Sequence, residues 1–285
     1  MKNLQHLKSA FSMLELIFVI VILGIVSSIG AEVIAQVYES YIVQRAQYRA
    51  NTKTEQALNQ IANRLRYAIP GTVGARVSKT SAFISITEIT STAQRDVLQW
   101  VGEDGDSFEA MTSTSRRPGW SGFIDLNQST TTTLVSPSSN LGLTDEIIQK
   151  LSGGSKTISN AKLYFPNGLP SINVTAGSTG ENINVSGLSS GSTISERYKL
   201  AWSSYAIVFE GSDLWLYYNF APNFGASLGT IKSKLLSNVT TFSFQGSEGS
   251  LRIKVCQYES IDSNVSVAVD TTKSAHSCKE KIVLY

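Results

Sequence analysis

The chain has few of the residues on which metal centres and general-base catalysis depend. Its 285 residues include only two cysteines and two histidines. This scarcity excludes a zinc module built on Cys/His clusters. Charged residues make up only 16%, and a net charge of +2 excludes nucleic-acid binding through bulk positive charge. With 42% hydrophobic residues the chain can still bury a sizeable core, so it is not a disordered tail.

Charge is absent over one long stretch near the N-terminus, from Leu16 to Ala31. The weakly polar run that includes it is about 20 residues long, enough to cross a bilayer as a helix. Lys2 and Lys8 precede the run and Glu32 follows it, which predicts a cytoplasmic N-terminus with the remainder outside. Glu15 interrupts the apolar residues. A carboxylate inside a membrane helix costs about 2.5–3.5 kcal/mol, so Glu15 is a candidate functional residue.

Two ordinary interpretations of this segment are open. A secretory signal peptide would use Ser28 and Gly30 as small residues before a cut at Ala31, although the apolar run is long for one and contains an acid. A simple membrane anchor would let Glu15 reach the headgroups. A third interpretation accounts for the charges, the acid and the apolar run together.

The segment Lys8-Ser9-Ala10-Phe11-Ser12-Met13-Leu14-Glu15-Leu16 resembles the processing site of type IV pilins and type II secretion pseudopilins. That family has a short basic leader, a small residue, and a Phe that opens a hydrophobic helix with Glu at its fifth position. The resemblance implies that a prepilin peptidase cleaves between Ala10 and Phe11 and methylates the new amino group of Phe11. Ala10 stands where the family nearly always has Gly, and Glu32 where the family often has Pro.

The same resemblance makes Glu15 an assembly determinant rather than a catalytic acid. In hydrocarbon an unpaired carboxylate and an unpaired ammonium are both costly, so a contact between Glu15 of one subunit and the Phe11 amine of its neighbour lowers both costs. Such a contact also sets the register of helices that pack through small residues such as Gly24. Loss of the leader removes Lys2 and Lys8, so 24 less two, or 22, basic side chains face 22 acidic ones.

The residues after Ala31 predict that the helix continues. Apolar residues recur at three-to-four spacing, and neither Gly nor Pro interrupts before Pro70-Gly71. We expect one helix from about Phe11 to Ala68, on the order of 85 Å long. The fold class is α+β, a long helix packed on a large antiparallel β-rich head. The expected parts are a leader at 1–10, a transmembrane half of the helix at 11–31, an amphipathic half at 32–69 and a periplasmic head at 70–285.

Beyond Gly71 the composition shifts to Ser and Thr, with short alternating runs typical of strands. Turn residues at Glu210–Asp213 and Gly246–Gly249 predict two hairpins. No repeat or linker divides the head. The expected strands are 81–89, 97–101, 158–165, 182–185, 204–209, 214–219, 239–245, 250–258 and 279–285.

Cys256 and Cys278 lie in the expected head, outside the membrane, where disulfides are permitted. A bridge between them closes a loop of about 20 residues, worth roughly 3 kcal/mol in the chain-entropy model. Two free buried thiols are the alternative. The resemblance agrees with the bridge, because pilins commonly have a disulfide in the C-terminal part of the head.

Three further patterns carry weaker signals. Arg45, Arg49 and Lys53 step by four and form a basic stripe, which either contacts an acidic neighbour or lipid headgroups or is a solvated face; the solvated face is favoured. The carboxylates of Glu103–Asp106 could bind a hard cation, but the pattern favours an ordinary acidic turn. Gly187–Gly191 matches G-x-S-x-G without its helix or a nearby histidine base.

Asn264 lies in a glycosylation-like pattern that favours a solvated loop. His276 is the only histidine beyond the leader, so a histidine base is scarce. We expect no enzyme activity, no cofactor and no metal.

The resemblance implies a non-enzymatic subunit of a type II secretion pseudopilus or a type IV pilus, which would initiate or cap the filament and contact cargo. The large head is similar to those of J-type minor pseudopilins and W-type minor pilins. Expected partners are the prepilin peptidase, other pilins through the helix, bacterial inner-membrane lipid and a secreted cargo protein. Near-neutral charge weighs against direct DNA binding. The rival hypothesis is a membrane-anchored periplasmic binding or enzymatic protein that does not polymerise.

Overall fold

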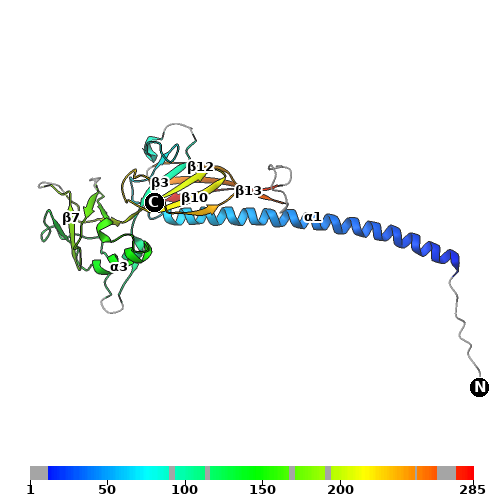
Figure 1. The fold of residues 1–285 in the computed structure, drawn as a ribbon, viewed down its shortest axis with the longest axis horizontal. Coiled ribbons are helices and arrows are strands. Elements are labelled where there is room, and N and C mark those ends of the chain that lie inside the picture. Colours follow the sequence, from blue (N-terminus) through cyan, green and yellow to red (C-terminus); the bar gives the residue numbers. More distant parts are fainter. Residues whose placement is uncertain are drawn as a thin grey trace, which may run out of the picture. The chain divides into compact units, whose positions relative to one another are not determined.

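The computed structural model describes residues 12–89, 94–112, 116–166, 171–189, 194–247, 249–261 and 274–285. It has the expected α+β fold, with one long N-terminal helix and a large region of antiparallel sheet (Figure 1). Contacts between residues divide the chain into two compact units. The larger unit comprises Ala50–Tyr258 and His276–Tyr285 and contains almost all of the head.

The long helix, α1, spans Met13–Leu65 and is about 80 Å long at 1.5 Å per residue. It ends three residues earlier than the pattern of apolar residues predicts. Ala68 N donates to Leu65 O at 2.9 Å to close a last turn, and Ile69 N donates to Val101 O at 2.9 Å. The chain therefore leaves the helix because its backbone is paired with a strand, before Pro70 is reached.

A six-stranded antiparallel sheet with the order β11-β10-β9-β3-β1-β2 forms the larger layer of the head. The β9–β10 hairpin is confirmed, with a turn at Gly211, whose φ of +69° suits glycine. A single 3-10 turn, η1 (Ile86–Glu88), follows the short edge strand. The strands are β1 (Gly74–Arg76), β2 (Ile84–Ser85), β3 (Val97–Gly102), β9 (Ser203–Glu210), β10 (Asp213–Phe220) and β11 (Lys232–Leu236).

A three-stranded sheet, in the order β12-β13-β14, is built from the C-terminal part of the chain. Its strands are β12 (Val239–Ser247), β13 (Ser250–Ser260) and β14 (Ser274–Leu284), so the second expected hairpin is also confirmed. The core that joins these layers contains apolar side chains from the second half of α1 and from both sheets. They include Leu58, Ile61, Leu65, Leu98, Trp100, Ile207, Phe242, Ile253 and Val283.

Residues 103–202 form an insertion between two paired strands, because Gly102 at the end of β3 pairs with Ser203 at the start of β9. The insertion has a five-stranded sheet in the order β4-β7-β6-β5-β8, drawn mainly in green in Figure 1. Its strands are β4 (Thr133–Val135), β5 (Lys162–Tyr164), β6 (Ile172–Val174), β7 (Asn182–Ser186) and β8 (Lys199–Ala201), and its helices are α2 (Gly105–Glu109), α3 (Leu141–Leu151) and the 3-10 turn η2 (Ile158–Asn160).

The insertion has a hydrophobic core of its own, which the sequence did not predict. Trp120, Leu141, Ile148, Leu163 and Ile183 are among its buried members. The amphipathic helix α3 supplies two of these side chains from a region that reads as Ser/Thr-rich loop. Among the described residues the head thus has two large apolar cores, beside two smaller apolar clusters.

Candidate functional site

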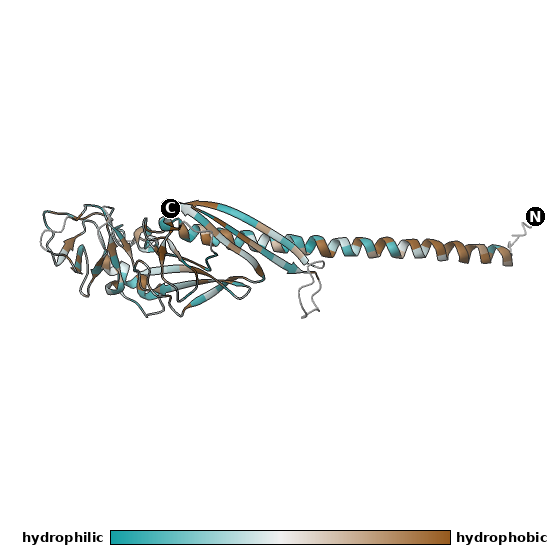
Figure 2. Ribbon diagram, turned by 90° about the horizontal axis from the view of Figure 1, so that it is seen from above, coloured by the Kyte–Doolittle hydropathy of each residue, from teal (hydrophilic) through white to brown (hydrophobic). Residues whose placement is uncertain are grey.

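The first half of α1 exposes a long apolar surface. Every large hydrophobic side chain from Met13 to Tyr41 is at least 46% exposed. Figure 2 shows the turns nearest the start of the helix in brown, and by length and composition α1 could cross a membrane. An exposed apolar surface of this extent is a site of contact with lipid or with other protein chains.

Glu15 lies in the first turn of α1, where it has a local role that sequence reasoning missed. The backbone N–H of Glu15 donates to Ser12 Oγ at 3.2 Å. Ser12 to Glu15 matches the S-x-x-E capping pattern, in which an acid at the third helical position suits both the free N–H groups and the helix dipole. A test of Glu15 therefore has to separate its charge from its place in the cap. Ala10 and Phe11, the expected cleavage pair, lie outside the described residues.

The disulfide between Cys256 and Cys278 is confirmed, with Cα atoms 4.1 Å apart and a sequence separation of 22. It joins β13 to β14 across neighbouring strands of the three-stranded sheet. Tyr258 and His276 lie on the same two strands, with their ring centroids 6.3 Å apart. The bridge therefore holds the C-terminal strand, and with it Val283, in the core.

The acidic segment Glu103–Asp106 opens α2, and its three carboxylates have three different surroundings. Glu103 Oε2 pairs with Lys199 Nζ at 2.6 Å. Asp104 is buried and its Oδ1 accepts from Ser107 N at 3.2 Å, which caps the helix. Burial raises the pKa of Asp104 from its ordinary 3.8 to about 6, although hydrogen bonds from Ser107 oppose the shift. Asp106 is exposed.

An acidic groove of about 330 Å³ lies beside this segment. The groove is lined by residues at or just after the end of α1, at or just after the end of β3, in α2 and in β9. A Cβ at Gly102 would lie 2.4 Å from the Tyr205 ring, so only glycine leaves this space. Burial raises the pKa of Tyr205, and the charge of Asp106 adds to the shift. The lining residues are Asn63, Arg64, Tyr67, Gly102, Glu103, Gly105, Asp106, Glu109 and Tyr205.

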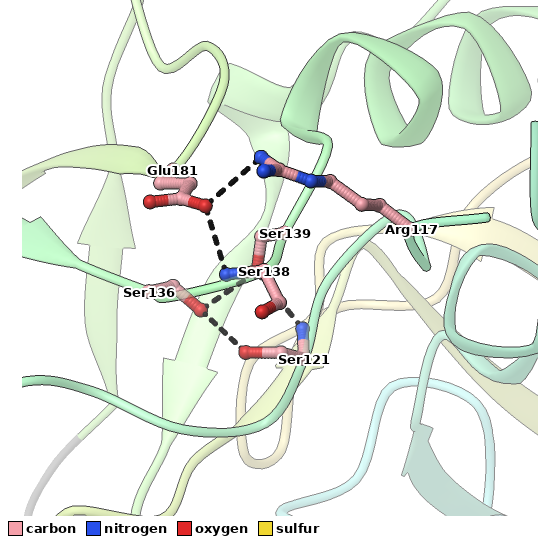
Figure 3. Close-up of polar contacts among 6 residues, drawn as sticks. All are labelled: Arg117, Ser121, Ser136, Ser138, Ser139 and Glu181. Atoms are coloured by element: carbon pink, nitrogen blue, oxygen red, sulfur yellow. Dashed lines mark hydrogen bonds and ion pairs between the residues drawn. The ribbon is translucent and has the colours of Figure 1, made fainter. Parts of the chain in front are cut away.

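A chain of hydroxyls inside the insertion joins three loops (Figure 3). Ser136 Oγ lies 2.8 Å from Ser139 Oγ and 3.1 Å from Ser121 Oγ. It also lies 2.8 Å from Tyr198 Oη, and burial raises the pKa of Tyr198 to about 12. Nucleophilic catalysis needs a base beside the serine. Ser136 contacts other hydroxyls instead, an arrangement that suits the stabilisation of loops.

An exposed ion pair between Arg117 and Glu181 lies beside these hydroxyls. Glu181 Oε1 accepts from Arg117 Nη1 and from Ser138 N, both at 3.0 Å (Figure 3). Ser138 has a φ of +64°, an uncommon conformation for a residue other than glycine. The bond from its N–H to Glu181 helps to hold that turn.

The remaining sequence motifs do not converge on one place in the described structure. Ser189 of the G-x-S-x-G match follows β7, whereas the residues after it lie outside the described part of the chain. His276 is exposed on β14. Asn264 also lies outside the described residues. Among the residues that are described, no three His, Cys, Asp or Glu side chains gather as a metal site would require.

Comparison of the chain with models of known protein families, with curated proteins and with solved structures found no match.

Proposed function

We propose that this chain is a pilin-like assembly subunit, a minor pseudopilin or minor pilin of a type II secretion system or type IV pilus. In this proposal the prepilin peptidase removes residues 1–10. The mature chain is then stored in the bacterial inner membrane, with its head in the periplasm, before assembly. It then enters a filament through the apolar half of α1 and contacts a secreted cargo through the head.

One observation supports the proposal. Glu15 lies in the first turn of an uninterrupted helix whose first half exposes its apolar side chains, and in the sequence it follows the Ala10-Phe11 pattern that resembles a prepilin processing site. Lipid can cover that surface in storage, and the same surfaces of other subunits can cover it in a filament. An acid placed at the start of such a helix is costly unless a cation of a neighbouring chain meets it.

The second half of α1 supports the same proposal. It is held in a core with two sheets of the head, so this half of the helix is part of the head. The disulfide adds to this stability in a compartment that permits such bridges.

Mass spectrometry of the N-terminal peptide, from protein purified out of its own membranes, tests the proposal. A peptide that starts at N-methylated Phe11 supports it. An intact Met1, or a start at Ala31, contradicts it and leaves an anchored or secreted β-rich domain. A deletion strain assayed for enzyme secretion, surface pili and transformation then distinguishes the three systems, and loss of none of them argues against the whole class.

A further inference from the structure

The glycosylation-like pattern around Asn264 occurs a second time, in a loop that the structure describes. Asp125-Leu126-Asn127-Gln128-Ser129 has the same acid, asparagine and hydroxyl at the same spacing. Asn-x-Ser/Thr, with x other than Pro, is the acceptor pattern of N-glycosylation, and its bacterial form is extended by an acid two residues before the asparagine. The segment therefore matches the longer and more restrictive form of the pattern.

The acid distinguishes two of the acceptor patterns from the rest. Five Asn-x-Ser/Thr sites occur in the chain, at Asn127, Asn173, Asn184, Asn238 and Asn264. Only Asn127 and Asn264 have an acid two residues earlier. Acids make up 22 of the 285 residues, so fewer than one of five sites is expected to have an acid there by chance.

Asn127 is presented on the surface of the insertion. It is exposed, in a turn between Asp125, which pairs with Val135, and strand β4. Its side-chain amide makes no hydrogen bond among the described residues, where only its backbone N–H is bonded. The amide nitrogen is therefore accessible to an enzyme.

The other three acceptors that the structure describes are held in place. Asn173 lies in the middle of β6, which is paired with β5 on one side and β7 on the other. Asn184 Oδ1 accepts from Thr133 Oγ1 at 3.2 Å, and its Nδ2 donates to Ala176 O at 3.3 Å. Asn238 is half-buried in a tight turn, with a φ of +56°. The acid in the sequence and the accessibility in the fold thus select the same residue.

The folded loop uses part of the acceptor pattern for its own bonds. Asp125 Oδ1 accepts from Asn127 N at 2.9 Å, and Ser129 Oγ accepts from Val135 N at 2.9 Å. A transferase that recognises the carboxylate and the hydroxyl therefore binds the chain before this loop closes, or opens it. Exposed loops open at a low free-energy cost, so neither route requires the head to unfold.

We propose that Asn127 is an N-glycosylation site, which receives an oligosaccharide from a polyprenyl diphosphate donor on the periplasmic side of the inner membrane. This inference rests on the proposed function for the periplasmic position of the head. In the transfer a bond forms between Asn127 Nδ2 and C1 of the first sugar, and the bond from C1 to the diphosphate oxygen breaks. The amide loses one proton to solvent, and the polyprenyl diphosphate leaves. The glycan adds a bulky, solubilising group beside Leu126, which is 41% exposed.

Mass spectrometry of the full-length protein, purified from its own membranes and digested, tests the proposal. The peptide that contains Asn127 should be heavier than its sequence by one oligosaccharide, and electron-transfer fragmentation should place the added mass on Asn127. Asn173, Asn184 and Asn238 should be unmodified. The Cys256–Cys278 bridge, detected in the same digest, shows that each sample is folded.

Matched variants separate recognition of the pattern from formation of the turn. Asp125→Asn keeps an oxygen that can accept from Asn127 N but removes the charge, so it should keep the turn and lose the glycan. Ser129→Ala should also lose the glycan. Asp125→Glu and Ser129→Thr retain the acid and the hydroxyl, and both should keep it.

Three results overturn the proposal. An unmodified Asn127 in the wild-type protein assigns Asp125 to the turn alone. A glycan that persists in Asp125→Asn shows that the acid is not recognised. Modification of Asn173 or Asn238 to the same extent as Asn127 shows that neither the acid nor the accessibility selects the site.

The N-terminal peptide of the same digest distinguishes the failure of this inference from the failure of the proposed function. An N-methylated Phe11 with an unmodified Asn127 leaves the proposed function standing and overturns only the glycosylation site. An intact Met1 with a glycan on Asn127 contradicts the pilin-like subunit, while the site stands on an exported head.

Discussion

Along Met13–Tyr41 the large apolar side chains of α1 are exposed, whereas along Ala50–Leu65 they are buried against two sheets of the head. Both stretches are regular helix, so secondary structure alone does not distinguish them. The second stretch packs against apolar side chains of the head. The first stretch has no such cover among the described residues, and lipid or other chains can provide it. The two stretches therefore differ in the surroundings of their side chains and not in their backbone conformation.

The largest expected difference in stability between the two halves comes from the same substitution placed in each. Ile61 is fully buried in the core, so Ile61→Ala should destabilise the head by about 4 kcal/mol through lost burial and a residual cavity. Ile22→Ala, in the exposed half, should change head stability by less than about 0.5 kcal/mol. Denaturant unfolding of full-length protein in detergent, followed by tryptophan fluorescence, measures both. Equal effects would contradict the division of α1 into two halves.

Loss of the disulfide should be the next largest effect. Cys256→Ser with Cys278→Ser removes a link across a separation of 22 residues, which costs roughly 3 kcal/mol in the chain-entropy model. Only unfolding of the head should respond, so insertion of the protein in membranes should be unchanged. The same unfolding curve, compared with that of reduced wild-type protein, gives the measurement. A stability within 1 kcal/mol of wild type would show that the sheet holds β14 without the bridge.

The buried carboxyl of Asp104 should make head stability depend on pH. Its pKa is raised from 3.8 to about 6, so the folded state binds more protons than the unfolded state between these values. Stability from this group is therefore greatest below pH 4 and is lost as the pH rises through 6, by about 2 to 3 kcal/mol. Asp104→Asn keeps an oxygen to accept from Ser107 N and should be more stable than wild type at pH 7. A parallel pH dependence in both proteins would exclude Asp104 as its source.

The smallest effect on stability, and the most specific effect on function, should come from Glu15. Glu15→Gln removes the charge yet suits the same place in a capping box, so unfolding of the head should change by less than about 0.5 kcal/mol. Under the proposed function, assembly with partner subunits should nevertheless fall sharply, because the charge that would meet a neighbour's amine has been removed. Recovery of filaments sheared from cells measures this, with Glu15→Asp as the charged control. Normal assembly of Glu15→Gln would assign Glu15 to the helix cap alone.

Local patterns predicted a large part of this molecule. The long helix, the two hairpins at Gly211 and Gly249 and the Cys256–Cys278 bridge follow from runs, turns and spacing that a few neighbouring residues define. The insertion was harder to predict. Helix α3 carries apolar residues at helical spacing, but it is short and lies in a Ser/Thr-rich region. The second core collects apolar side chains from segments that meet only after the chain has folded.

The sequence by itself determined the apolar run, the place of Glu15 within it and the continuity of the helix, because periodicity and charge act within one or two turns. The tertiary structure decided where that helix ends, which carboxylates are buried and which face a groove. Ile69, just beyond the end of the helix, pairs its backbone with Val101. Asp104 is buried, whereas Asp106, two residues later, is exposed. These outcomes depend on pairing and packing between segments far apart in the chain, and no local pattern records such contacts.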